Sequence, residues 1–431
     1  MLRHLCVILL VSSRAWAVGI AMLLGGLLTG VAAVPAAAQP AAFRFVRGAA
    51  RQAKVPFFLQ RNLILVKTWL NGKGPFTFIL DTGINTSLIT DPRLRQELNL
   101  TVGGRFLVAG AGEENPLEAF QIPAVAVRLA DGVEAPALPF LMLSDDVLNL
   151  SGYVGAPVHG LLGADVFRSF VVEVNPVSEM LTLRAPATYR PPAGRRWARI
   201  PLDMEGRKSY LTVPVQLNDT LRLPVKLVLD TGAGHALSLE TTSDARLQVP
   251  QHRLRTQLGR GLNGNINGYL GRVSALELGR YRVPALLTSF PDAADVALRV
   301  DVPRNGNLGF ELLKRFTVVI DYAHNQLLLR PNETFHDPFE HDMCGFEVLA
   351  TGPKLRQFKV LRVEAAGPAA AAGIQPGDEI LSVNLMPAEM LTLTQLSRLL
   401  HSADGRQLLF IVRRAATSEL FTTTLRLKRQ I

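Results

Sequence analysis

The chain has 431 residues, 48% of them hydrophobic and 19% charged, so it is long enough for two or three domains with sizeable cores. Its formal net charge is +10, but the basic residues are spread out and form no stripe or aromatic-interleaved patch, so we expect no nucleic-acid partner. Only two cysteines occur, Cys6 and Cys344, which excludes a disulfide framework and leaves the fold to ordinary cores.

The first 38 residues have the pattern of an export signal. Arg3 and Arg14 form a positively charged start, an apolar run follows, and small residues up to Ala38 offer a cleavage site. An uncleaved amino-terminal anchor is the alternative, although glycines and a proline interrupt the apolar run. We therefore predict an exported protein (periplasmic, secreted or in the cell envelope) cleaved after Ala38, with a short segment at 39–55 before the first domain.

An internal repeat organises the middle of the chain. An apolar, strand-like run ends in Asp-Thr-Gly at Asp81 and again at Asp230. A second matched pair of segments, 160–184 and 306–330, aligns without gaps at nearly the same separation. Two blocks repeated in the same order indicate two copies of one domain. The predicted boundaries are 56–185 for the first copy, 186–205 for the linker and 206–331 for the second copy.

Each copy is predicted to be mainly β. In the first copy, strand-like runs at 63–70 and 76–80 flank a glycine-rich turn, and the second run leads into Asp81. The second copy repeats this plan at 211–217 and 223–229. Further strands are predicted at 171–174, 181–183, 317–320 and 327–329, and short helices at 164–168 and 311–315.

The two Asp residues suggest a reaction. If the copies pair about a pseudo-twofold axis, Asp81 and Asp230 meet, and two carboxylates in contact share one proton because both cannot easily ionise. The ionised carboxylate can then deprotonate a water while the protonated one hydrogen-bonds a substrate carbonyl, which is general acid–base hydrolysis without a metal or a cofactor. Gly83 and Gly232 permit the tight turn that this arrangement needs.

These motifs resemble the aspartic peptidases, specifically their retropepsin-like lobes. In that family each lobe carries a strand ending in Asp-Thr-Gly and a later apolar-apolar-Gly element, matched here at 161–163 and, less closely, at 307–309. The resemblance implies a mainly β fold of two pseudo-twofold-related lobes and an aspartic-type endopeptidase that acts on polypeptides. It implies catalytic Asp81 and Asp230, interlocking Thr82 and Thr231, and supporting glycines Gly83 and Gly232.

The residue after each motif is usually Ser, Thr or Ala in that family. Ala233 fits this pattern and Ile84 does not, so the bulk of Ile84 either disturbs the turn or fills an apolar gap. Neither residue has a hydroxyl that could hydrogen-bond a catalytic carboxylate. We therefore expect both carboxylates to lack this contact, the pair to hold its shared proton to higher pH, and activity to peak under mildly acidic conditions.

Other interpretations stay open. Ile84 favours a non-catalytic, exported peptide-binding scaffold built from peptidase-like lobes. Each lobe could instead pair with another chain in an obligate oligomer, or both Asp residues could sit on ordinary turns of unrelated β domains. Flap hairpins are expected over the cleft at 108–120 and 259–271, but no residue in them can be assigned a role.

The pattern changes after a linker at 332–343. Residues 344–431 resemble a PDZ domain, and the Gly-Pro-Ala to Gly-Asp-Glu-Ile-Leu run within 367–384 is the most specific part. The resemblance implies that backbone N–H groups at Gly345 and Phe346 hold the C-terminus of a peptide that adds as a strand. A PDZ domain that only packs on the lobes is the alternative. Its predicted elements are strands at 358–364 and 407–412 and a helix at 394–402.

No metal site is predicted. The segment 336–342 contains two histidines and two acidic residues, but their spacing is not His-x-x-Glu-His and Pro338 opposes the helix that would align them. His235 follows Asp230 closely, and we expect a solvated or hydrogen-bonded histidine. Cys344 is expected to be a packed residue rather than a nucleophile, because no base pattern surrounds it.

Overall fold

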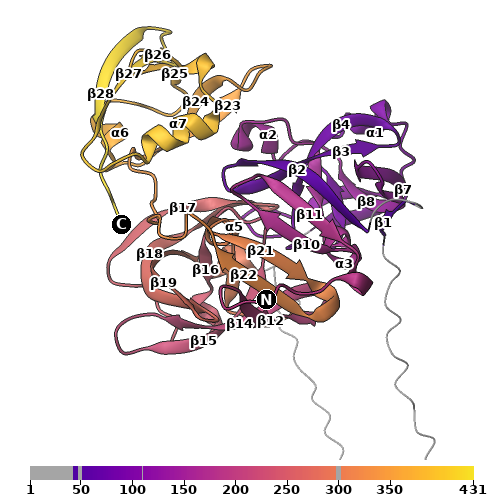
Figure 1. Ribbon diagram of the computed structural model, residues 1–431. Helices are drawn as coiled ribbons and strands as arrows, with labels where there is room; N and C mark the ends of the chain where they lie inside the picture. Colours follow the sequence, from indigo (N-terminus) through magenta and orange to yellow (C-terminus); the bar gives the residue numbers. More distant parts are fainter. Residues whose placement is uncertain (1–41, 47–50, 109, 298–301) are drawn as a thin grey trace, which may run out of the picture. The chain divides into compact units, whose positions relative to one another are not determined.

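The structure, a computed structural model, describes residues 42–46, 51–108, 110–297 and 302–431 (Figure 1). The expected export signal lies outside these residues. Within the described ranges the protein is mainly β, with two lobes followed by a third, smaller domain. The helices of these ranges are all too short or too polar to cross a membrane.

Lobe 1 places Asp81 at the end of a central strand. The last five residues of β4 (Lys73–Leu80) are buried, as expected for a run of apolar and β-branched side chains inside a sheet. Strand β4 pairs in parallel with β9 (Gly160–Leu162), which pairs antiparallel with β5 (Ser87–Ile89). Further elements of this lobe are β1 (Arg44–Phe45), β3 (Leu63–Leu70), β6 (Arg105–Val108), β7 (Leu117–Ala130), β8 (Val133–Leu143), α1 (Leu94–Glu97), α2 (Leu150–Val154) and α3 (Asp165–Ser169).

Lobe 2 repeats this topology, which confirms the predicted internal repeat. Strand β15 (Arg222–Leu229) pairs in parallel with β20 (Gly306–Leu308), and β20 pairs antiparallel with β16 (Leu237–Leu239). Asp230 therefore follows a buried central strand as Asp81 does. Further elements of this lobe are β13 (Asp203–Glu205), β14 (Lys208–Gln216), β17 (Arg253–Gly261), β18 (Gly264–Leu278), β19 (Tyr281–Pro291), α4 (Ala293–Val296), α5 (Phe310–Leu313) and the 3-10 helices η2 (Thr241–Ser243) and η4 (Tyr322–His324).

The two lobes pair with each other within the chain. Strand β10 (Val171–Asn175) of lobe 1 runs antiparallel to β21 (Phe316–Asp321) of lobe 2, with Val174 opposite Val318. The flanking strands extend this pair into one sheet: β2 (Gln52–Gln60), β11 (Met180–Arg184), β12 (Ala198–Pro201) and β22 (Gln326–Pro331).

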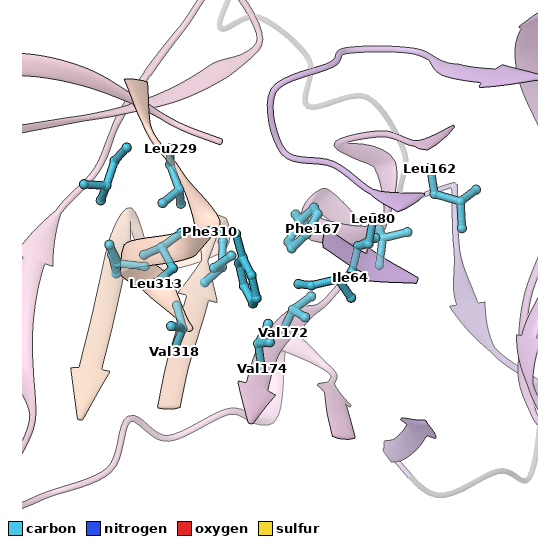
Figure 2. Close-up of a cluster of buried hydrophobic side chains, with 14 of the residues drawn as sticks. Ile64, Leu80, Leu162, Phe167, Val172, Val174, Leu229, Phe310, Leu313 and Val318 are labelled. Carbon is cyan, nitrogen blue, oxygen red and sulfur yellow. The ribbon is translucent and has the colours of Figure 1, made fainter. Parts of the chain in front are cut away.

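One hydrophobic core runs beneath both lobes. Figure 2 shows Phe167 and Val172 of lobe 1 close to Phe310 and Val318 of lobe 2, and all four side chains belong to the same buried cluster. Burying one such side chain stabilises a fold by about 1.5–3 kcal/mol. This shared core gives the two lobes a fixed relation to each other.

The third domain has its own core and a six-stranded sheet, in which β23 (Phe346–Thr351) is an edge strand. Its helix α7 (Leu393–Leu400) begins at a capping box formed by Thr392 and Gln395. The other elements are β24 (Gln357–Val363), β25 (Glu379–Val383), β26 (Met386–Pro387), β27 (Gln407–Arg413), β28 (Leu420–Arg426), α6 (Pro368–Ala371) and the 3-10 helix η5 (Ala388–Met390).

Candidate active site

The two Asp-Thr-Gly turns interlock where β4 and β15 end. The N–H of Thr82 donates to Oγ1 of Thr231 at 3.0 Å, and the N–H of Thr231 donates to Oγ1 of Thr82 at 3.0 Å. Each hydroxyl then donates to a carbonyl of the opposite lobe, Thr82 to Leu229 at 2.6 Å and Thr231 to Leu80 at 2.8 Å. Both threonines are buried, so these four bonds tie the turns together out of water.

The carboxylates of Asp81 and Asp230 line the same cleft, which has a volume of about 1360 Å³. Each glycine N–H donates to Oδ1 of the Asp in its own turn, Gly83 at 2.6 Å and Gly232 at 3.1 Å. Each carboxylate also lies against the opposite glycine: a Cβ on Gly232 would stand 2.3 Å from Oδ2 of Asp81, and one on Gly83 would stand 2.8 Å from Oδ1 of Asp230. Only glycine leaves room for the two carboxylates.

Asp81 is only 6% exposed. Burial, and then the charge of Asp230, raise the pKa of Asp81 to about 7, against the opposing effects of Lys208 and of the two glycine N–H groups. Asp81 therefore keeps a proton through the mildly acidic range, as a carboxyl group in a proton-sharing pair does.

The surroundings of the two carboxylates differ. In β20, Asn307 donates from Nδ2 to Oδ2 of Asp230 at 2.8 Å. The topologically equivalent residue of β9 is Leu161, whose side chain has no donor. Residues 84 and 233 supply no hydroxyl to either carboxylate, but the amide of Asn307 gives Asp230 a side-chain donor that the sequence analysis did not foresee. The only signal in the sequence was the poorer match of 307–309 to the apolar-apolar-Gly element.

Ile84 fills an apolar gap and leaves the turn intact. Its side chain packs against the cluster that contains Leu88, Val154 and Leu161, and its carbonyl accepts a hydrogen bond from the N–H of Ala164 at 3.1 Å. The interlocking N–H bonds of the two turns have the same length, so the bulky residue in lobe 1 does not distort that turn.

The two expected flap segments meet at Asn263, between β17 and β18. Its N–H donates to the carbonyl of Ala111 at 2.8 Å, and its carbonyl accepts from the N–H of Glu114 at 2.7 Å. Its Nδ2 also donates to the carbonyl of Asn115 at 2.6 Å. Asn263 is fully buried, although it lies at a hairpin tip. It had not been singled out, because its partners come from the other lobe.

The remaining candidates have other roles. His235 lines the cleft, and in the described part of the chain no three His, Cys, Asp or Glu side chains gather to hold a metal. Glu340 of the linker forms a two-bond ion pair with Arg429. Cys344 is buried and donates from Sγ to Asp342 at 2.8 Å, and burial together with this carboxylate raises the pKa of the thiol well above its usual value.

The predicted peptide-binding pair lies at the start of β23. The N–H of Gly345 (φ +75°) donates to Oδ2 of Asp342 at 2.7 Å, and the N–H of Cys344 donates to Oδ1 at 3.2 Å. Phe346 points into the core of the third domain. An internal carboxylate therefore already contacts the Gly345 donor that the sequence assigned to a peptide C-terminus.

Fold and site together define a two-lobed aspartic-peptidase structure followed by a PDZ domain. The family model described as aspartyl protease matches residues 66–166 and 213–312, and the model described as PDZ domain matches 359–414. The two lobes thus match the aspartyl protease family, and the third domain matches the PDZ family.

Among solved structures, the aspartic proteinase from Irpex lacteus is similar with a TM-score of 0.45 and 12% identity, over 66% of this chain and 99% of that one. Basic 7S globulin from soybean is similar with a TM-score of 0.39 and 11% identity, over 67% and 96% of the two chains. No curated protein matches the chain.

Proposed function

We propose that the protein is an aspartic-type endopeptidase in which Asp81 and Asp230 activate a water. The observation that carries this proposal is the pair of interlocked turns, which holds both carboxylates in one cleft. Because the pKa of Asp81 is raised to about 7, its carboxyl group keeps the single proton that the reaction needs.

The proposed reaction moves protons within the pair and returns it to its starting state. The Asp230 carboxylate takes a proton from the water as the water oxygen bonds to the peptide carbonyl carbon, and Asp81 gives its proton to the carbonyl oxygen. When the C–N bond of the resulting gem-diol breaks, Asp230 gives a proton to the leaving nitrogen and Asp81 takes one from a gem-diol hydroxyl. No covalent intermediate forms.

The cleft suits a polypeptide better than a small molecule. Its volume of about 1360 Å³ exceeds the 300–1,000 Å³ typical of small-ligand pockets. The flap segments that meet at Asn263 contribute to its wall through residues such as Ala111 and Leu262. A polypeptide would thus enter by separating the flaps and would be covered when they close again.

The test is peptide cleavage by Asp81→Asn and Asp230→Asn, with an unfolded protein as the substrate. Each variant should abolish hydrolysis while remaining folded, and the double variant should be no worse than either single one, because the residues act as a unit. The exposed residue Asp219 offers a matched control, Asp219→Asn, which should cleave normally. Wild-type turnover in either single dyad variant would overturn the proposal.

A peptide-binding scaffold without catalysis is the second candidate. Ile84 favoured it, but the packing of Ile84 against an apolar cluster removes the main reason to expect a damaged turn. A scaffold would bind extended peptides and release no product at any pH. Mass spectrometry of the incubated peptide distinguishes the two candidates.

For the PDZ domain we propose binding of polypeptide segments by strand addition at β23. Helix α2 of lobe 1 lies against β23, so a bound segment would have to move this helix aside. The C-terminal peptide expected at Gly345 and Phe346 would also have to displace the carboxylate of Asp342 from the Gly345 N–H. Calorimetry with extended peptides tests the binding itself.

We also propose that residues 1–38 direct export and are cleaved after Ala38, on the pattern of charged, apolar and small residues. The mature protein would then begin at Gln39. Amino-terminal sequencing of protein recovered from the cell envelope or the medium tests this, and an intact Met1 would contradict it.

A further inference from the structure

Asp230 is held at both of its oxygens. Oδ1 accepts from the N–H of Gly232 at 3.1 Å and Oδ2 accepts from Nδ2 of Asn307 at 2.8 Å. Asn307 is 8% exposed, and its backbone is fixed by the parallel pairing of β20 with β15, in which it lies opposite Val228. The amide is therefore a built-in donor rather than a mobile surface group.

The same positions in lobe 1 are apolar. Leu161 stands where lobe 2 has Asn307, Ile84 stands where lobe 2 has Ala233, and both belong to or pack on one hydrophobic cluster. Apolar surroundings favour the neutral form of a carboxyl group, whereas a hydrogen-bond donor favours the ionised form. The two lobes therefore act on their carboxylates in opposite directions.

We infer that Asn307 is a positioning residue that keeps Asp230 ionised and so places the shared proton on Asp81. This inference rests on the proposed peptidase function and assigns the roles within it. Asp230 is the base that deprotonates the water, and Asp81 is the acid that protonates the carbonyl oxygen. Asn307 itself need not touch the substrate.

Other charged or titratable groups near the pair do not supply this asymmetry in the same direct way. Lys208 of β14 favours the ionised form of Asp81, which opposes the assignment, and His235 lines the cleft beyond the lobe 2 turn. The Tyr322 hydroxyl in η4 pairs with Ser209 at 2.8 Å, and burial raises the pKa of this phenol, so it stays neutral. The direct hydrogen bond from Asn307 is the contact that distinguishes the two carboxylates.

The test is the pH dependence of kcat/KM for Asn307→Leu, which gives lobe 2 the residue of lobe 1. With the proton on Asp81, Asp230 is ionised in both the singly protonated and the fully ionised pair. Losing the donor then raises only the pKa that separates the doubly protonated pair from the singly protonated one. The acid limb should therefore move to higher pH by roughly one to two units, while the basic limb keeps its position. A proton held on Asp230 would instead shift the basic limb and leave the acid limb, which would overturn the inference.

Two further variants separate positioning from mere structure. Leu161→Asn should place a donor beside Asp81 and move the basic limb to lower pH. Ala233→Ser in the Asn307→Leu background should move the acid limb part of the way back to its wild-type pH, because a serine hydroxyl after the motif can supply the lost hydrogen bond. Thermal melts check folding, and Asn307→Ala replaces the leucine variant if that variant does not fold.

A failed inference and a failed proposed function give different results. If the wild type cleaves peptides and the acid limb of a folded Asn307 variant is unmoved, the inference is wrong and the peptidase remains. If the wild type cleaves nothing, the proposed function fails, and ¹³C NMR titration of the Asp carboxyl carbons still tests the inference. In that experiment an unchanged Asp230 titration in the variant would overturn it.

Discussion

Replacing Thr231 by Val is the sharpest test of the interlocked turns. The change removes one oxygen that accepts from the N–H of Thr82 at 3.0 Å and donates to the carbonyl of Leu80 at 2.8 Å. Thr231 is fully buried, so water cannot replace either partner. The variant leaves two buried groups of lobe 1 unsatisfied, the N–H of Thr82 and the carbonyl of Leu80.

The expected loss follows from those two groups. A buried polar group left without its partner costs about 1–3 kcal/mol, and the added methyl group of Val recovers about 0.8 kcal/mol if it finds room. We expect Thr231→Val to lower the free energy of unfolding by about 2–4 kcal/mol. The matched control Thr231→Ser keeps both hydrogen bonds and loses one methyl group, so it should cost about 1 kcal/mol.

Urea unfolding followed by tryptophan fluorescence measures this loss in the lobes alone. The chain has three tryptophans: Trp16, Trp69 and Trp197. None lies in the PDZ domain, and Trp16 leaves with the proposed signal. Thr82→Val should cost about as much as Thr231→Val, because each hydroxyl accepts one N–H bond and donates one bond to a carbonyl of the opposite lobe. A valine variant within 0.5 kcal/mol of its serine control would refute the reasoning.

The pKa of Asp81 rises from 3.8 to about 7 in the folded protein, so its contribution to the free energy of unfolding is full below pH 4 and is lost as the pH rises through 7. Between pH 5 and pH 8, the free energy of unfolding in urea should therefore fall less for Asp81→Asn than for the wild type. Asn263→Ala removes the hydrogen bonds that its side chain makes to Gly110 and Asn115 of the opposite flap segment. It should raise KM several-fold more than the control Asn265→Ala, which removes one exposed hydrogen bond to the same segment. Equal KM values would argue against Asn263 holding the flaps together. Asp342→Ala frees the N–H of Gly345, so calorimetry should show tighter binding of peptides with a free C-terminus than of their amides, a difference absent in the wild type.

Much of the lobe architecture was predictable because it is written in local patterns. The strand at 63–70 was predicted with its observed bounds, and the strand predicted at 223–229 begins one residue earlier in the structure. Helix α3 begins one residue later than predicted and α5 one residue earlier, as is common at frayed helix ends. Alternating or continuous apolar runs fix such segments without reference to the rest of the fold.

The functional details that were missed depend on contacts between distant segments. Asn307 donates to a residue 77 positions earlier in the chain, and Asn263 donates to one 148 positions earlier. Asp342 lies close to Gly345 in the sequence, but it was considered only as a metal ligand, which the spacing argued against, and not as an acceptor for the Gly345 N–H. A single polar side chain has no periodicity, so only the folded geometry shows which atom it meets.

Two unlike lobes in one chain can give the carboxylates of Asp81 and Asp230 different neighbours. In a symmetric pair of identical lobes, a donor beside one carboxylate would stand beside the other as well, and the shared proton would have no preferred side. Here the interlock is kept symmetric by Thr82 and Thr231, whose reciprocal bonds are equal in length. The residues behind each turn differ instead, Leu161 in lobe 1 and Asn307 in lobe 2. The chain can thus hold the two carboxylates in the same geometry and still give one the role of acid and the other the role of base.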